Sequence, residues 1–195
     1  DMPTHAERYA VAHEFLEVTF KLWEGWQEGA VQPDNASGQY FVNEKINPVN
    51  HQGKYFQVQG PLNITRSPQG RPVIIEAGSS ADGQKLAAAT AEVVFTAAAT
   101  LEEAQTFYRA QKQQVKEAGR NPEHMLILPG VMPIVGRTRE EARETWHELN
   151  SLVDIDNGIR QLSTRFNMDL SVFPLDGPVP DVPAGEGNQS RVKLL

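Results

Sequence analysis

Residues 72–88, PVIIEAGSSADGQKLAA, join an apolar run to a helix-forming run through a turn of small residues, Gly78, Ser79 and Ser80. Glycine lets the backbone approach a ligand closely, and serine hydroxyls add hydrogen-bond donors to the N–H groups at a helix start. Such a turn is suited to bind a phosphate group. The alternative is that Ser79 or Ser80 only caps the helix, which the same residues would do equally well.

A second group with the same chemistry lies near the start of the chain. His5 and Tyr9 are four residues apart, so a helix would place both on one face within its opening turns, where the helix dipole favours an anion. An imidazole and a phenol can both donate hydrogen bonds to phosphate oxygens. Arg8 lies one position off that face, so we interpret it as a solvated or salt-bridged side chain and not as a ligand of the anion. The alternative is that His5 caps the helix and Tyr9 is half-buried beside it.

The helix that would carry His5 and Tyr9 is indicated by its apolar spacing and by its capping residues. Residues 4–26 place apolar side chains at the three-to-four spacing of one helix face. Thr4 followed by Glu7 is a capping-box pattern, which predicts that the helix begins near Thr4, and Gly25 and Gly29 mark its end.

From Pro72 onward, strand-like and helix-like segments alternate. The predicted order is strand Val73–Ala77, a helix to Ala89, strand Val93–Thr96, helix Leu101–Ala118, strand Met125–Val135 and helix Glu140–Val153. This alternation predicts an α/β fold with parallel strands joined by right-handed crossovers. The strands are apolar on both sides, so we expect helices to cover the faces of the sheet or barrel.

The remaining segments are read as additions to one domain spanning residues 1–195. Residues 30–71 are rich in Pro, Gly and Asn and predict an excursion with only short strand-like pieces, such as Tyr55 to Val58. Residues 167–195 predict an irregular segment rich in Pro and Gly, which is either a loop over a substrate or a surface tail.

Composition excludes several classes of function. The net charge of −7 without a run of like charges argues against a nucleic-acid partner or an anionic membrane. The sequence contains no Cys, which excludes disulfides, thiolate metal sites and a cysteine nucleophile. No apolar stretch approaches the length of a membrane span, so we expect a cytoplasmic protein. His13, His51, His124 and His147 lack carboxylates at ligand spacing, so we expect no metal site.

Several stretches resemble a known family when they are taken together and in this order. HAERYAVAHEFLEVTFKLWEGW, HQGKYFQVQGPLNITRSPQGRPVIIEAGSS, AEVVFTAA and FPLDGPVPDVP are similar to segments of the flavin-dependent monooxygenases of the bacterial luciferase-like superfamily. The resemblance is to the branch that includes nitrilotriacetate and dibenzothiophene-sulfone monooxygenases. It implies a TIM (β/α)8 barrel with a long insertion, of which this chain looks like the middle and later part.

The resemblance also implies a cofactor, partners and binding residues. Members of the family use reduced FMN, supplied by a separate flavin reductase, to oxidise a small organic substrate with O2. The family's flavin-binding His and Tyr fall on His5 and Tyr9, and its phosphate-binding serines fall on Ser79 and Ser80, beside Gly78. No catalytic residue is identified, and a homo-oligomer is possible.

One departure and two alternatives belong with this resemblance. Glu76 stands where many relatives would carry a neutral amide. The alternatives are a non-catalytic flavin- or phosphate-binding barrel fragment and an unrelated α/β phosphate-binding enzyme. We expect that the chain by itself shows no turnover, because protecting a reactive flavin from water would need a complete barrel.

Overall fold

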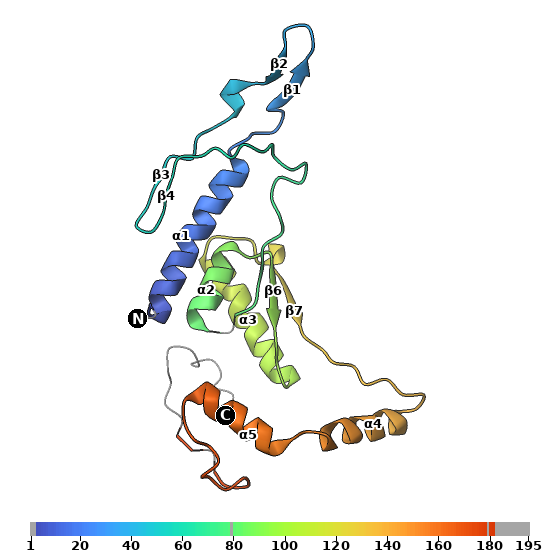
Figure 1. Cartoon of the computed structure of the whole chain (residues 1–195). Coiled ribbons are helices and arrows are strands. Elements are labelled where there is room, and N and C mark those ends of the chain that lie inside the picture. Colours follow the sequence, from blue (N-terminus) through green and yellow to red (C-terminus); the bar gives the residue numbers. More distant parts are fainter. Residues whose placement is uncertain (1–2, 79, 179, 182–195) are drawn as a thin grey trace. The chain divides into compact units, whose positions relative to one another are not determined.

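The computed structural model describes residues 3–78, 80–178, 180 and 181 (Figure 1). The chain divides into two compact units, residues 1–128 and residues 129–195, which are described separately below. Within the described residues, no helix is both long and apolar enough to cross a membrane.

The first unit begins with α1, His5–Glu24, which confirms the predicted long helix. Thr4 is its N-cap, and the Thr4 hydroxyl accepts the N–H of Glu7 at 3.3 Å. Gly25 is the C-cap, and its N–H donates to the carbonyl of Leu22. These caps fix where the helix starts, and therefore fix His5 and Tyr9 in its first two turns.

The α/β part of this unit follows the predicted order. It consists of β5 (Ile75–Glu76), α2 (Ala81–Thr90), β6 (Val93–Thr96), α3 (Leu101–Glu117), the short 3-10 helix Pro122–His124 and β7 (Leu126–Pro129). The strands form one sheet in the order β5-β6-β7, and β5 and β6 are parallel, with Ile75 opposite Val93. Parallel strands joined by a helix are the βαβ unit that alternation predicts.

The predicted strand Met125–Val135 is wrong in its second half, because β7 ends at Pro129. Val131, Met132 and Val135 are strongly exposed instead. Pro129 and Pro133 have no N–H to donate to a neighbouring strand, which explains why an apolar run here does not continue as a strand.

The core of the first unit lies between the sheet and its two helices. It consists of Ala87, Ala88, Ala91, Val94, Val115 and Met125, with Ile74 and Phe107 packed against it. The small side chains of Ala87 and Ala88 on α2 and of its C-cap Ala91 let this end of the helix pack closely in the core.

Two polar side chains from α3 and the residues after it hold α2 at both ends. The Arg120 guanidinium donates to the carbonyls of Ala87, Ala88 and Ala91 at 3.3, 2.8 and 2.7 Å, which satisfies the last turn of α2. Buried Gln111 donates to the carbonyl of Gln84 in the first half of α2 at 3.0 Å.

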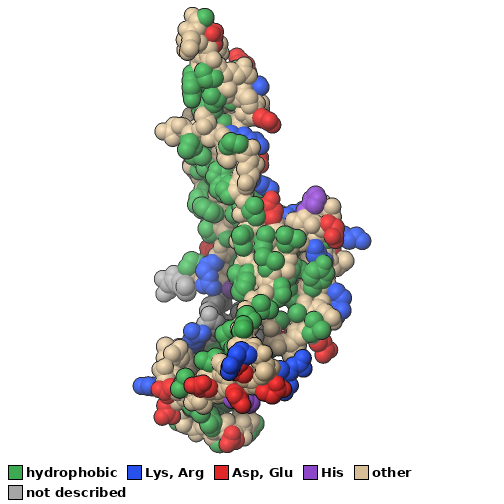
Figure 2. Space-filling model, turned by 90° about the vertical axis from the view of Figure 1, so that its right-hand side faces the viewer, with side chains coloured by type: hydrophobic (Ala, Val, Ile, Leu, Met, Phe, Trp, Pro, Cys, Tyr) green, Lys and Arg blue, Asp and Glu red, His purple; other side chains and the backbone are tan. Residues whose placement is uncertain are grey.

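The opposite face of the sheet is exposed, which corrects the expectation that helices cover both faces. Ile75 on β5, Phe95 on β6, and Leu126 and Leu128 on β7 are 49–65% exposed, while the side chain of Val94 between them is fully buried. Hydrophobic side chains form a broad area on the face shown in Figure 2. The strands therefore carry apolar side chains on both faces of the sheet. Among the described residues, helices α2 and α3 cover only one of these faces.

The excursion between α1 and β5 contains two small antiparallel hairpins. One pairs β1 (Val31–Asp34) with β2 (Gln39–Phe41), and the other pairs β3 (His51–Gln52) with β4 (Gln57–Val58). A short 3-10 helix, Asn43–Lys45, lies between the hairpins. The first hairpin and β3 were not predicted, because so few residues in each strand give no readable alternation.

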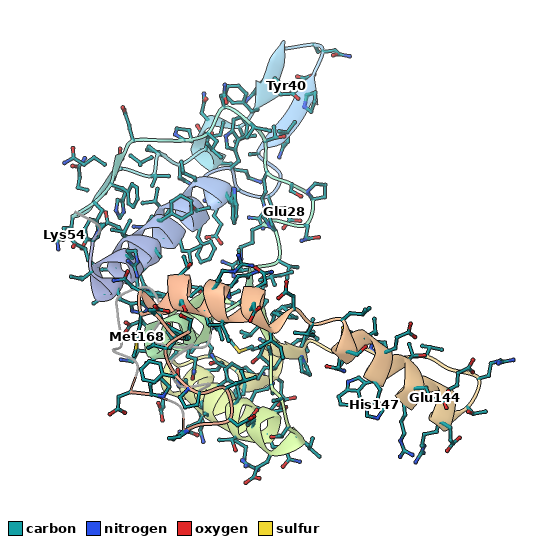
Figure 3. The ribbon with its side chains drawn as sticks, turned by 60° about the horizontal axis from the view of Figure 1, so that its bottom comes forward. Glu28, Tyr40, Lys54, Glu144, His147 and Met168 are labelled. Atoms are coloured by element: carbon teal, nitrogen blue, oxygen red, sulfur yellow. The ribbon has the colours of Figure 1, made fainter. Side chains whose placement is uncertain are left out.

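The second unit contains α4 (Arg139–Ser151) and α5 (Ile155–Phe166). Helix α4 confirms the predicted helix within two residues, and Glu144 and His147 project from it in Figure 3. Helix α5 was not predicted. Its boundaries are set by Asp154, whose carboxylate accepts the N–H of Asn157 at 3.0 Å, and by Asn167, which ends it in a left-handed conformation.

Candidate functional site

The first turns of α1 and α2 meet at a pair of hydroxyl groups. The Ser80 hydroxyl donates to the Tyr9 hydroxyl oxygen at 3.3 Å, although 71 residues separate the two in sequence. Both side chains are partly buried. The structure thus brings Tyr9 and Ser80, two of the residues singled out from the sequence, into contact. Ser79 lies outside the described residues.

His5 is held in this group by an acidic residue from α2. His5 Nδ1 lies 2.8 Å from Asp82 Oδ2, and the two side chains are 18% and 38% exposed. The His5 ring also packs on the Tyr9 ring, with centroids 4.8 Å apart and planes inclined by 46°. A ring contact on one side and a hydrogen bond on the other fix the orientation of the imidazole.

Ser80 is also the N-cap of α2, as one alternative for the turn required. Its hydroxyl oxygen accepts the N–H of Gly83 at 3.2 Å. The remaining N–H groups at the start of α2, and the positive end of its dipole, lie at the same place as the Tyr9 and Ser80 hydroxyls. Capping and anion binding are therefore compatible here, because they use different donors.

Glycine at position 83 lets the Tyr9 and Ser80 hydroxyls approach the start of α2 closely. A Cβ at Gly83 would lie 2.8 Å from the Tyr9 hydroxyl oxygen and 3.1 Å from Ser80 Oγ, which is closer than side chains pack. A Cβ at Gly78 would lie 3.8 Å from the same Tyr9 oxygen. Any side chain at position 83 would therefore push the Tyr9 and Ser80 hydroxyls away from the start of α2.

Asp82 and Gly83 were not singled out from the sequence. The signal was present in SSADG, where an acidic residue and a glycine follow the turn within the first turn of the helix. Asp is common in the first turn of a helix because the helix dipole stabilises its negative charge, so the pattern alone did not indicate a partner for His5.

Glu76 lies at the end of β5 but is bonded to the far end of α2. Thr90 Oγ1 lies 2.7 Å from Glu76 Oε1 and 2.6 Å from the carbonyl oxygen of Leu86. Burial raises the pKa of the Glu76 carboxyl above its usual value, opposed by the Thr90 hydroxyl and by the charges of His13 and Arg120. The Glu76 carboxyl therefore lies between β5 and the last residue of α2, and not at the helix start where Tyr9 and Ser80 meet.

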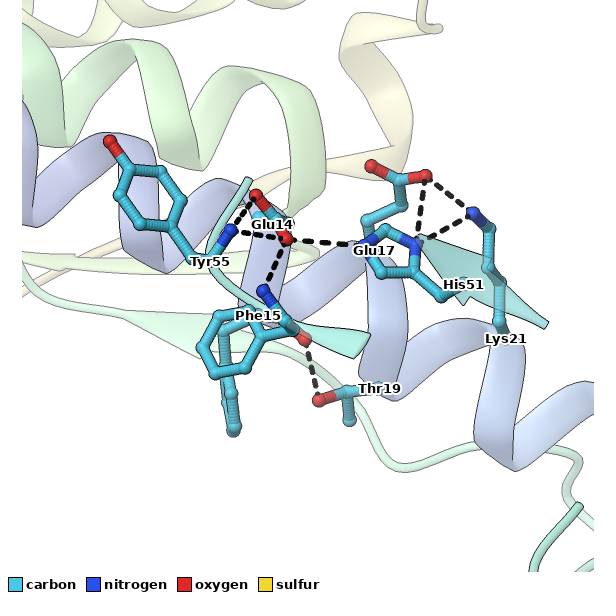
Figure 4. Close-up of polar contacts among 8 residues, drawn as sticks. Glu14, Phe15, Glu17, Thr19, Lys21, His51 and Tyr55 are labelled. Atoms are coloured by element: carbon cyan, nitrogen blue, oxygen red, sulfur yellow. Dashed lines mark hydrogen bonds and ion pairs between the residues drawn. The ribbon is translucent and has the colours of Figure 1, made fainter. Parts of the chain in front are cut away.

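A second polar cluster joins α1 to the excursion (Figure 4). Glu14 accepts the N–H groups of Tyr55 and Phe56 at 3.0 and 2.7 Å, and its Oε1 lies 3.2 Å from Nε2 of buried His51. His51 therefore does have a carboxylate partner, 37 residues away in sequence, which the spacing of neighbouring residues could not show. Lys21 Nζ lies 3.3 Å from His51 Nδ1 on the other side of the ring.

These groups do not assemble into a metal site. Throughout the part of the chain that the structure describes, no three His, Asp or Glu side chains are placed so that they could hold a metal ion. Both carboxylate oxygens of Glu14 accept backbone N–H groups of the β3–β4 hairpin, so this cluster holds the hairpin against α1.

A comparison with protein families matches residues 2–171 to the family described as luciferase-like monooxygenase. The chain is 47% identical to N-acetyl-S-(2-succino)cysteine monooxygenase of Bacillus subtilis (strain 168), over 98% of the chain and 44% of that protein. It is 45% identical to nitrilotriacetate monooxygenase component A of Aminobacter aminovorans, over 98% and 43%. It is 42% identical to dibenzothiophene-sulfone monooxygenase of Rhodococcus erythropolis, over 91% and 39%.

Solved structures give the same result. The crystal structure of long-chain alkane monooxygenase (LadA) superposes with a TM-score of 0.82 at 34% identity, covering 93% of this chain and 42% of that one. A structure of riboflavin lyase (RcaE) with modified FMN and the substrate riboflavin superposes with a TM-score of 0.81 at 28% identity, covering 91% and 40%. The chain thus spans less than half the length of the proteins that it matches.

Proposed function

Because the chain belongs to the luciferase-like monooxygenase family, we propose that it forms the cofactor-phosphate site of an FMN-dependent, two-component monooxygenase. Its sheet and helices correspond to part of the family's TIM barrel, and the excursion before β5 is the long insertion. The family assignment excludes an unrelated α/β phosphate-binding enzyme.

The observation that carries the proposal is the meeting of Tyr9 and Ser80 at the start of α2. In TIM barrels, phosphate groups bind where loops at the carboxyl ends of strands lead into helix N-termini. Gly78 and Ser80 occupy such a loop after β5, and α1 brings His5 and Tyr9 to it. The riboflavin lyase structure, which is described with modified FMN, supports an FMN-type ligand for this arrangement.

The residues present fit an FMN phosphate. Tyr9 and Ser80 would donate their hydroxyls to its oxygens, and His5 would donate from its ring. The N–H groups at the start of α2, which Gly83 lets the two hydroxyls approach, would complete the set of donors. Ser79 belongs to the same proposal as a second hydroxyl. When bound, reduced FMN supplies the electrons with which O2 oxidises the substrate. The chain's own residues anchor the phosphate end and so fix where the flavin lies.

The partners follow from the same assignment. The relative named component A indicates a second component, which in our proposal is a flavin reductase that delivers reduced FMN. The substrate is a small organic molecule, as the names of the matched monooxygenases suggest. A cytoplasmic location is part of the proposal.

The test compares FMN with riboflavin, which lacks the phosphate. Tyr9→Phe combined with Ser80→Ala removes two donors, each contributing about 1 to 3 kcal/mol if the bond is charge-assisted. We expect FMN affinity, measured by flavin fluorescence quenching, to fall at least about tenfold, in line with that range, while riboflavin affinity stays nearly constant. Tyr40→Phe, an exposed tyrosine on β2, is the matched control and should change neither. Equal losses for the two flavins would show that Tyr9 and Ser80 do not contact the phosphate.

A further inference from the structure

We propose that Gly83 is the positioning residue that gives the site its preference for a flavin with a phosphate group. The inference rests on the proposed function and adds a residue to it. Gly83 lies in the first turn of α2, where its N–H donates to the Ser80 hydroxyl oxygen at 3.2 Å. Because Gly83 has no side chain, the hydroxyls of Tyr9 and Ser80 can meet beside it at 3.3 Å.

Glycine is not the residue that the helix itself favours at this position. Alanine is the best helix former, whereas glycine is among the worst because it loses the most backbone freedom. The φ of Gly83 lies outside the left-handed region that favours glycine. The residue is also buried, three and four positions before buried Leu86 and Ala87, so an added methyl group would be removed from water. Helix propensity and burial therefore both favour alanine, and the glycine needs another explanation.

The explanation lies in the atoms that a methyl group would meet. A Cβ at position 83 would lie 2.8 Å from the Tyr9 hydroxyl oxygen and 3.1 Å from Ser80 Oγ, while the next atom, Gly78 Cα, is at an ordinary contact distance of 3.5 Å. The Tyr9 oxygen is the far end of a side chain on another helix, so it can move away while the backbone of α2 stays in place. Alanine at position 83 would thus be accommodated by displacing the two hydroxyls that we assign to the phosphate.

This displacement would affect a phosphate more than the rest of a flavin. Hydrogen bonds weaken steeply when their distance and angle depart from the ideal, and bonds to a charged phosphate are the strong ones. Riboflavin has no phosphate group, so its affinity does not depend on where the Tyr9 and Ser80 hydroxyls lie. Gly83 would therefore set the ratio of FMN affinity to riboflavin affinity.

A purely structural role is the competing explanation. Gly83 could be required only so that α1 and α2 pack closely against each other, since Tyr9 on α1 lies beside it. In that case alanine would lower the stability of the protein and weaken the binding of both flavins by the same factor. A positioning role gives the opposite result for stability, because alanine is the better helix former.

The experiment measures the affinities of FMN and riboflavin, by flavin fluorescence quenching, and the urea midpoint of Gly83→Ala. We expect the ratio of FMN to riboflavin affinity to fall about tenfold, the equivalent of about one charge-assisted hydrogen bond. The urea midpoint should stay the same or rise. Stability and phosphate preference would then change in different directions, which loss of packing cannot produce.

A double-mutant cycle with Tyr9→Phe tests the route by which Gly83 acts. Tyr9→Phe removes the atom that lies nearest to the added methyl group, so it removes most of the conflict as well as one phosphate donor. In the Tyr9→Phe background, Gly83→Ala should therefore lower the affinity ratio by less than about threefold. An undiminished effect in that background would show that Gly83 does not act through Tyr9.

Gly158→Ala is the matched control. Gly158 also lies in the first turn of a helix, α5, and a Cβ there would meet nothing within 4 Å. The same chemical change in open space should leave the affinities of both flavins unchanged. A fall in the affinity ratio in Gly158→Ala would show that the ratio does not report on the conflict at position 83.

Failure of this inference can be told apart from failure of the proposed function. An unchanged affinity ratio in Gly83→Ala, or equal losses for both flavins with a lower urea midpoint, would overturn the role of Gly83. If Tyr9→Phe with Ser80→Ala still lowered the ratio, the proposed function would stand. A wild-type protein that binds FMN no better than riboflavin would overturn the proposed function, and the role of Gly83 with it.

Discussion

At the scale of single residues, the contact between Glu76 and Thr90 contains more hydrogen-bond acceptors than the Thr90 hydroxyl can satisfy. Thr90 Oγ1 has one hydroxyl proton but lies within hydrogen-bond distance of two acceptors, Glu76 Oε1 and the Leu86 carbonyl. If Thr90 donates to Leu86, an ionised Glu76 is left facing an oxygen lone pair. Protonation of Glu76 resolves this conflict, in agreement with the raised pKa that burial gives its carboxyl.

Glu76→Gln should therefore stabilise the protein at neutral pH. A carboxyl whose folded pKa lies above its unfolded value binds more protons in the folded state, so stability falls as pH rises from the unfolded pKa through the folded one. Gln imitates the protonated acid, because its amide can donate to Thr90. We expect a higher urea midpoint for Glu76→Gln at about pH 8 and little difference at about pH 4, below both pKa values.

Glu144→Gln on exposed α4 is the matched control and should leave both midpoints unchanged. If Glu76→Gln lowered stability at the higher pH, Glu76 would have to be ionised and favourably paired in the native state.

At the scale of elements, Glu14 is the clamp that holds the β3–β4 hairpin on α1. Desolvation raises the pKa of Glu14, but the hydrogen bonds from the Phe56 N–H, His51 and the Tyr55 N–H outweigh it and hold that pKa below its usual value. For a lowered pKa the stabilisation is present above the unfolded pKa and is lost as pH falls through the folded one. The hairpin should therefore detach on acidification before the α/β core unfolds.

Amide hydrogen exchange at Tyr55 and Phe56 measures this attachment. Glu14→Gln should speed exchange at both amides about tenfold or more at neutral pH, because one of its two terminal atoms becomes a donor that faces other donors. Glu17→Gln is the control: Glu17 pairs with Lys21 and lies 3.9 Å from His51, so the two amides should keep their protection. Unchanged exchange in Glu14→Gln would mean that the hairpin is held by other contacts.

The elements also show what the sequence could and could not reveal. Helices α1, α2, α3 and α4 and strand β6 were predictable, because each combines local periodicity with a capping residue or a β-branched run. His5, Tyr9 and Ser80 could each be singled out from the sequence because each lies near the start of a recognisable helix, but the contact between Tyr9 and Ser80 depends on packing between α1 and α2. Partners such as Glu14 with His51 were not predictable, since they depend on packing between segments 37 residues apart.

At the scale of the whole chain, we expect the exposed apolar face of the sheet to promote self-association. Ile75, Phe95, Leu126 and Leu128 expose a contiguous run of apolar side chains on neighbouring strands, where isolated apolar residues would need no explanation. In a TIM barrel this side of the strands faces the interior and helices cover the other side, which agrees with the position of α2 and α3.

The 195-residue chain should bind a hydrophobic dye through this face and self-associate as its concentration rises. Ile75→Thr combined with Phe95→Thr places a β-branched residue with good strand propensity at both positions, and should lower dye fluorescence and shift sedimentation toward the monomer. Leu101→Thr removes an exposed apolar side chain at the start of α3 and serves as the control. Dye binding that is the same in all three proteins would locate the apolar surface elsewhere.

The two-ended attachment of α2 has a consequence for how the molecule fluctuates. Gln111 holds the first half of α2 and Arg120 holds its last carbonyls, so α2 cannot fray at either end without breaking bonds to α3 or to the residues that follow it. The two helices should open as one cooperative unit, and their amides should exchange at similar rates. A ligand at the start of α2 would then slow exchange throughout α3, at amides that it never touches.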